Sequence, residues 1–86
     1  MEDYSKNVEG LVEYLVTNLV EDKDSIQLET QVDESADILI NVKVDQNDIG
    51  RVIGKDGNII KSIRTLARAC VAKEDIRVDV ELDEDE

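Results

Sequence analysis

The chain has 86 residues, 41% of them apolar and none of them Phe or Trp, so we expect one small domain with an aliphatic core. It has no His and a single cysteine, Cys70, which excludes Ser-His-Asp and Cys-His catalysis, zinc ribbons and an internal disulfide. We therefore predict no enzyme and no metal or cofactor site. The net charge of -12 is unevenly spread, at -10 over residues 1–50, +5 over 51–73 and -7 over 74–86, and a local positive segment can still attract phosphate.

The first half of the chain predicts one helix and two strands. A helix over about residues 3–21 is indicated by apolar residues at spacings of three and four, namely Val8, Leu11, Val12, Leu15 and Leu19. Residues 25–32 and 37–44 alternate apolar and polar positions, which is typical of strands, and the short polar segment between them predicts a hairpin. The first residues lack the basic and apolar regions of a signal peptide, and no apolar run reaches about 20 residues, so we expect a cytoplasmic protein.

The second half predicts two helices and a third strand. Residues 45–48 offer side-chain oxygens that can cap a short helix, which ends at Gly54. A longer helix begins at Asn58, and its predicted apolar arc consists of Ile59, Ile60, Ile63, Leu66, Ala67, Cys70 and Val71. A third strand over 75–82 precedes an acidic tail at 83–86. The helix pair between the second and third strands is a crossover, which implies parallel pairing and a right-handed connection.

These elements predict an α+β domain over residues 1–82. Its order is α-β-β-α-α-β, with a three-stranded mixed sheet and three helices on one face.

The sequence Gly54-Lys55-Asp56-Gly57 connects the two central helices. Glycine adopts positive φ and lets a ligand approach the backbone closely, and the free amides of a helix N-terminus favour an anion. Lys55 adds a positive charge, so phosphate is the simplest ligand. Asp56 should weaken phosphate binding, although an Asp there can also cap the following helix.

The run Val-Ile-Gly-Lys-Asp-Gly-Asn-Ile-Ile at 52–60, between a short and a long helix, closely resembles the KH domain, and the order of elements is that of its type II form. Residues 48–57 and 63–66 are similar to the single-domain bacterial KhpA family. The resemblance implies an RNA-binding protein that acts as an RNA chaperone and forms homodimers. It also implies pairing with a second KH protein, KhpB, in regulation linked to the cell envelope and cell shape.

The resemblance also assigns site residues. Gly54, Lys55, Asp56 and Gly57 would clamp the backbone of about four unpaired nucleotides. The candidates for an aliphatic groove wall are Ile49, Val52, Ile53 and Ile60, each of which is at least as readily explained as core, and those for flanking phosphate contacts are Arg51 and Lys61. Exposed helix faces often carry solvated charges, so the roles of Arg64 and Arg68 stay open.

Two other functions were weighed against RNA binding. A P-loop requires four residues between its glycines and a Ser or Thr for magnesium, whereas Gly50 and Gly54 enclose three residues and Asp56 stands at the magnesium position, so a nucleotidase is rejected. A KH-like domain used only for protein association, with an acidic surface meeting a basic partner, remains the alternative.

Overall fold

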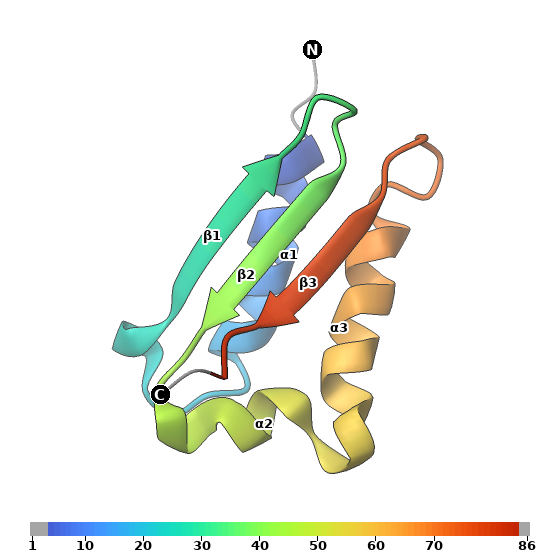
Figure 1. Ribbon diagram of the computed structural model, residues 1–86. Coiled ribbons are helices and arrows are strands. Elements are labelled where there is room, and N and C mark those ends of the chain that lie inside the picture. Colours follow the sequence, from blue (N-terminus) through green and yellow to red (C-terminus); the bar gives the residue numbers. More distant parts are fainter. Residues whose placement is uncertain (1–3, 85–86) are drawn as a thin grey trace.

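The computed structural model describes residues 4–84, which form an α+β domain with the predicted order of elements (Figure 1). Its helices and strands are α1 (Tyr4–Thr17), β1 (Gln27–Val32), β2 (Ile38–Lys43), α2 (Ile49–Ile53), α3 (Asn58–Ala69) and β3 (Val78–Leu82). In Figure 1, α1 lies behind the sheet and α3 runs beside β3. The predicted tail at 83–86 is described only as far as Glu84. Among these residues, no helix has the length and hydropathy that a bilayer-spanning segment needs.

The strands form one mixed sheet in the order β1-β2-β3, so β1 and β3 are its edges. Strands β1 and β2 are antiparallel, with Leu28 opposite Val42, whereas β2 and β3 are parallel, with Ile40 opposite Val80. The predicted hairpin and the predicted parallel crossover are therefore both confirmed. Because the crossover carries α2 and α3, the turn between these helices lies at one end of the sheet (Figure 1).

The first helix is shorter than predicted. Residue 3 lies outside the described chain, and α1 ends at Thr17 rather than near residue 21. The side-chain amide of Asn18 donates to Tyr14 O at 2.8 Å, which satisfies a carbonyl at the helix end. Glu21 is the last residue of the predicted helix, and Asp22 follows it. Both donate their backbone amides to the carboxylate of Asp48, so the chain has left the helix here.

Two strands also begin later than predicted. Lys23–Ser25 forms a 3-10 turn, so the first strand starts at Gln27 rather than at residue 25. The third strand starts at Val78 rather than at residue 75, because residues 70–75 form the turn after α3. Pairing with β2 begins at Arg77, whose carbonyl accepts a hydrogen bond from Ile38 N at 2.8 Å.

The core is aliphatic, as the composition predicts. It lies between the sheet and the helices, and nine further apolar residues pack around it half-buried. Its buried members are Val8, Val12, Val16, Val20, Ile38, Ile40, Val42, Val44, Val52, Ile60, Ile63, Ala67, Val71, Val78 and Val80.

The predicted apolar arc of α3 is too wide. Ile60, Ile63 and Ala67 are buried, but Leu66 is 47% exposed and Cys70 is also exposed. Successive helical residues differ by about 100° around the axis, so Leu66 lies roughly a quarter turn from Ala67. Since α3 contacts α1, α2 and β3 along a single stripe, a residue that far from the stripe faces solvent. The placement of Leu66 and Cys70 in the core was therefore wrong.

Candidate functional site

The loop between α2 and α3 is a tight turn with positive φ at three of its four positions. Gly54 has φ 77° and ψ 175°, Asp56 has φ 58° and ψ 23°, and Gly57 has φ 74° and ψ 14°. The turn is closed by a hydrogen bond from Gly57 N to Gly54 O at 3.1 Å. The predicted positive φ of both glycines is confirmed, and the presence of Asp56 in the left-handed region fits the tolerance of Asp for that conformation.

The two glycines are required for different reasons. A Cβ added at Gly54 would lie only 2.7 Å from Cβ and 2.8 Å from Cδ1 of Ile59, so the start of α3 packs directly on the Gly54 backbone. A Cβ added at Gly57 would meet nothing nearer than Lys61 Cε, at 3.9 Å. The open side of the loop is therefore at Gly57, and this is where a ligand can approach the backbone.

The two residues between the glycines are exposed. Within residues 4–84, the side chain of Lys55 makes no hydrogen bond or ion pair, so its ammonium group is free to meet an anion. The expectation that Asp56 caps α3 is wrong. The N-cap residue is Gly57 and no side chain accepts a hydrogen bond from the helix start, because the left-handed backbone places Asp56 one residue too early. The first amides of α3 therefore have no side-chain acceptor within the described chain.

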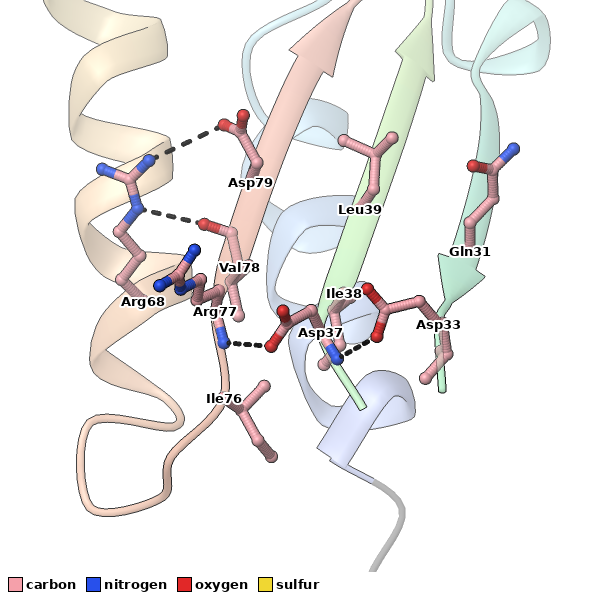
Figure 2. A pocket seen from close by; sticks show the side chains of 11 residues that line it. Gln31, Asp33, Asp37, Ile38, Leu39, Arg68, Ile76, Arg77, Val78 and Asp79 are labelled. Carbon is pink, nitrogen blue, oxygen red and sulfur yellow. Dashed lines mark hydrogen bonds and ion pairs between the residues drawn. The ribbon is translucent and has the colours of Figure 1, made fainter. Parts of the chain in front are cut away.

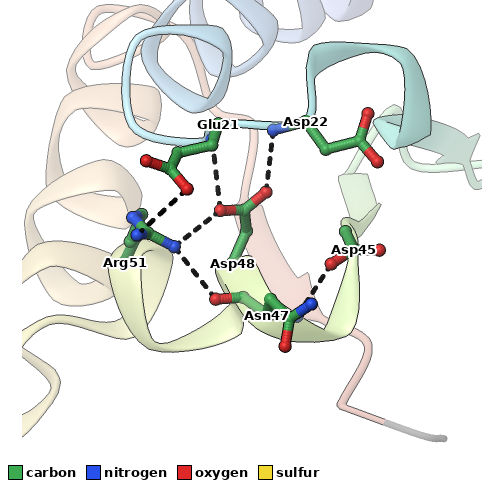
Figure 3. Close-up of polar contacts among 6 residues, drawn as sticks. All are labelled: Glu21, Asp22, Asp45, Asn47, Asp48 and Arg51. Atoms are coloured by element: carbon green, nitrogen blue, oxygen red, sulfur yellow. Dashed lines mark hydrogen bonds and ion pairs between the residues drawn. The ribbon is translucent and has the colours of Figure 1, made fainter.

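Arg51 belongs to a polar network that joins α2 to the end of the first helix (Figure 3). Its Nη1 donates to Asp48 Oδ1 at 2.9 Å and to Asn47 O at 3.0 Å, and its Nη2 lies 3.3 Å from Glu21 Oε1. Two carboxylates thus compensate the charge of Arg51. Its predicted role as a flanking phosphate contact would require it to leave or share these partners.

The centre of this network is Asp48, which is 2% exposed. Its carboxylate accepts hydrogen bonds from Asp22 N at 3.0 Å and Glu21 N at 3.1 Å. Those two bonds, and then the neighbouring Arg51, lower the pKa of Asp48 despite the opposing effect of burial. The sequence showed Asp48 only as a possible cap. Asp45 accepts from Asn47 N at 2.9 Å and so caps the 3-10 turn Gln46–Asp48, whereas α2 itself has no side-chain cap. The amides bound by Asp48 lie 26 and 27 residues away.

The four aliphatic candidates for the groove wall divide into two pairs. Val52 is fully buried and Ile60 is 7% exposed, so both belong to the core and support the wall from beneath. Ile49 and Ile53 are partly exposed and are the two that a ligand can touch. Core packing thus explains Val52 and Ile60, whereas ligand contact stays open to Ile49 and Ile53.

The basic face predicted on α3 lies against β3. Lys61 is exposed near Gly57, while Arg64 and Arg68 reach across to the outer edge of the strand. Lys61 is therefore the member of this face that flanks the loop directly. Sequence reasoning did not find the carboxylate that faces Arg64 and Arg68, that of Asp79. The only signal was its polar position in the alternating pattern of the last strand.

The chain is similar throughout most of its length to one protein family. The family model described as "KhpA/KhpB, KH domain" matches residues 9–82. The RNA-binding protein KhpA of Borreliella burgdorferi is 39% identical over 82 residues, which cover 95% of this chain and 98% of that protein. The protein of the same name from Clostridium acetobutylicum is 40% identical over 72 residues, covering 84% and 95%. That of Chlamydia trachomatis is 35% identical over 72 residues, covering 84% and 91%.

Proposed function

The chain belongs to the KhpA/KhpB family of KH domains, and from that premise we propose that it binds short single-stranded RNA segments at the loop of residues 54–57. The family is one of RNA-binding proteins and not of enzymes. The observation that carries the proposal is the open backbone at Gly57, beside a free ammonium group on Lys55. A nucleotide strand can approach such a loop closely enough for the backbone to hold its phosphates, and KH loops clamp about four nucleotides in this way.

Each residue of the clamp has a distinct role in this proposal. Gly54 fixes the turn against α3, and Gly57 provides the approach. Lys55 supplies the positive charge and Lys61 flanks the strand on the α3 side. Asp56, which is exposed between the glycines, sets a negative charge beside the phosphates and keeps the affinity of the single site low.

The bases would lie against the exposed aliphatic surface of α2. Ile49 and Ile53 form this surface, and Val52 and Ile60 hold it in place from the core. An aliphatic surface without aromatic rings selects unpaired bases by shape and not by stacking. Arg51 already binds two carboxylates. It therefore contributes a phosphate contact only where the RNA strand shares the guanidinium group with those carboxylates.

One clamp of about four nucleotides gives only low affinity for RNA, which favours the pairing of two KH domains. Two linked weak sites gain affinity through effective concentration, so we propose that the chain acts as a homodimer or together with a KhpB-type KH protein. In that form it would work in the cytoplasm as an RNA chaperone, in post-transcriptional regulation linked to the cell envelope and cell shape. The name of the matching family model, which joins KhpA and KhpB, supports the choice of partner.

The test is a charge reversal in the loop with a matched control. Lys55→Asp should lower RNA affinity at least tenfold in a fluorescence anisotropy titration with a labelled single-stranded oligonucleotide. Lys73→Asp makes the same charge change at an exposed site beyond the far end of α3 and should leave the affinity nearly unchanged. Far-UV circular dichroism and melting should show that both variants stay folded.

Equal losses in the two variants would mean that only the overall charge matters and that the loop is not the clamp. Failure of the parent protein to bind any single-stranded RNA would favour the alternative, a module for protein association.

A further inference from the structure

The basic face of α3 is anchored to the outer edge of the sheet. Arg64 Nε donates to Val80 O at 2.8 Å, and Arg68 Nε donates to Val78 O at 3.0 Å. Because β3 is an edge strand, these carbonyls have no strand neighbour on that side. Figure 2 shows the bond from Arg68 reaching sideways from the helix to the strand. Both guanidinium groups are therefore fixed at the surface through Nε, and each keeps its two Nη groups, with four N-H donors, for other acceptors.

A single carboxylate lies between the two arginines. Asp79 Oδ1 is 3.7 Å from Arg64 Nε and 3.7 Å from Arg68 Nη2, and the pair with Arg68 is visible in Figure 2. The same oxygen accepts a hydrogen bond from Val80 N at 2.9 Å, which holds the carboxylate on the strand. The Asp79 side chain is 53% exposed and that of Arg68 57%, so both can be reached from solvent.

A surface hollow connects these residues to the proposed clamp. It has a volume of about 520 Å³, and its lining residues are Lys61, Arg64, Thr65, Arg68, Asp79 and Glu81. The side chain of Lys61 lies beside Gly57, so the hollow begins where the loop is open. From Lys61 to Arg68 the helix rises by about 10 Å, with cations along that length. A strand that leaves the loop along α3 would enter this hollow.

We propose that Asp79 is an intramolecular competitor of RNA phosphate for Arg64 and Arg68. The strand that leaves the 54–57 loop runs into the hollow between α3 and β3, where a phosphate takes the place of the Asp79 carboxylate beside Arg64 Nε and Arg68 Nη2. The inference rests on the proposed RNA-binding function. A phosphate and a carboxylate offer arginine the same kind of paired oxygen acceptors, so the two compete for the same charges. Asp79 therefore lowers the affinity for a strand that enters the hollow from the loop.

The test removes the charge of Asp79 and keeps its shape. In Asp79→Asn the amide oxygen can still accept the hydrogen bond from Val80 N. An exposed ion pair contributes at most about 1 kcal/mol, and two such pairs are lost, so we expect RNA to bind roughly three- to tenfold more tightly. The melting temperature should change little, since Asp79 and Arg68 are more than half exposed and Arg64 is half-buried rather than buried.

The matched control is Glu29→Gln, which changes the net charge by the same amount. Glu29 is exposed on β1, and its register partner Asn41 faces Glu81 on β3, so Glu29 is two strand spacings, about 10 Å, from that strand. This distance exceeds the Debye length of about 8 Å at physiological salt, and the affinity should change less than twofold.

A double-mutant cycle separates the competitor role from a structural one. Arg68→Gln should weaken binding, and in that background Asp79→Asn should lose about half or more of its gain. Equal effects of Asp79→Asn and Glu29→Gln, or an unchanged gain in the Arg68→Gln background, would overturn the inference while the parent protein still binds RNA. Absence of RNA binding by the parent protein, in contrast, would refute the proposed function itself.

Discussion

Alanine substitutions at the two loop glycines should have very different effects on stability. Gly57→Ala places an L residue at φ 74° with open space around it, and the left-handed conformation costs about 1 to 2 kcal/mol. Gly54→Ala adds a side chain at φ 77° and ψ 175°, a region that essentially only glycine occupies, with a strain of about 1 to 3 kcal/mol. It also forces the new Cβ against Ile59, and overpacking of this kind costs about 1 to 3 kcal/mol more.

The free energy of unfolding should therefore fall by about 2 to 6 kcal/mol in Gly54→Ala and by about 1 to 2 kcal/mol in Gly57→Ala. Urea titrations followed by circular dichroism measure both values. Gly10→Ala is the control, because Gly10 lies inside α1 with nothing within 4 Å of an added Cβ. That substitution should stabilise the protein by about 0.5 to 1 kcal/mol.

An equal or smaller loss in Gly54→Ala than in Gly57→Ala would refute the reasoning. It would mean that Ile59 can move away from the loop at little cost, and that the contact between the loop and α3 does not set the shape of the turn. A Gly57→Ala protein that is stable but binds RNA weakly would agree with an approach of the strand at Gly57.

Three further predictions follow from the described contacts. Ile63→Asp should unfold the protein, since a buried unpaired carboxylate costs several kcal/mol, whereas Leu66→Asp should melt close to the parent because Leu66 is 47% exposed. Asp48→Asn should lower the melting temperature at pH 7 more than Asp24→Asn at an exposed site. Because folding lowers the pKa of Asp48, its carboxylate stabilises the folded state at pH values above its unfolded pKa near 3.8. This stabilisation is lost as the pH falls from that value through the folded pKa, so the melting temperatures of the two variants should converge in acid. Affinity for single-stranded RNA should fall with salt at a slope of about -1.5 to -3, as two to four phosphate contacts give, and duplex RNA should bind less tightly.

The order of elements and their pairing could be predicted because both depend on local patterns. Alternation over β2 places Ile38, Ile40 and Val42 on one face, and all three are buried. The positive φ at Gly54 and Gly57 could be predicted from the absence of a side chain. These features need no knowledge of distant residues.

The rest depends on contacts between distant segments. Whether Leu66 is buried depends on how α3 lies against the edge of the sheet, which the periodicity of one helix does not fix. The end of α1 depends on the carboxylate of Asp48, and the positions of Arg64 and Arg68 depend on the strand that follows. The sequence indicated each of these side chains as polar or basic, but not the partner that decides what it can bind.

The ion pairs of three arginines limit the free positive charge that this acidic chain can offer to a phosphate. The net charge of +5 over residues 51–73 overstates what a phosphate meets, because Arg51, Arg64 and Arg68 all face carboxylates within 4 Å. Within the described chain, the other cations of this segment, Lys55, Lys61 and Lys73, have no such partner, and the first two lie at or beside the open side of the loop. At the proposed clamp, attraction would therefore come mainly from these two lysines, while the acidic body would repel a strand elsewhere. Since few free charges act at the proposed clamp, we expect the fit of unpaired bases to the α2 surface to supply much of the predicted preference for single strands.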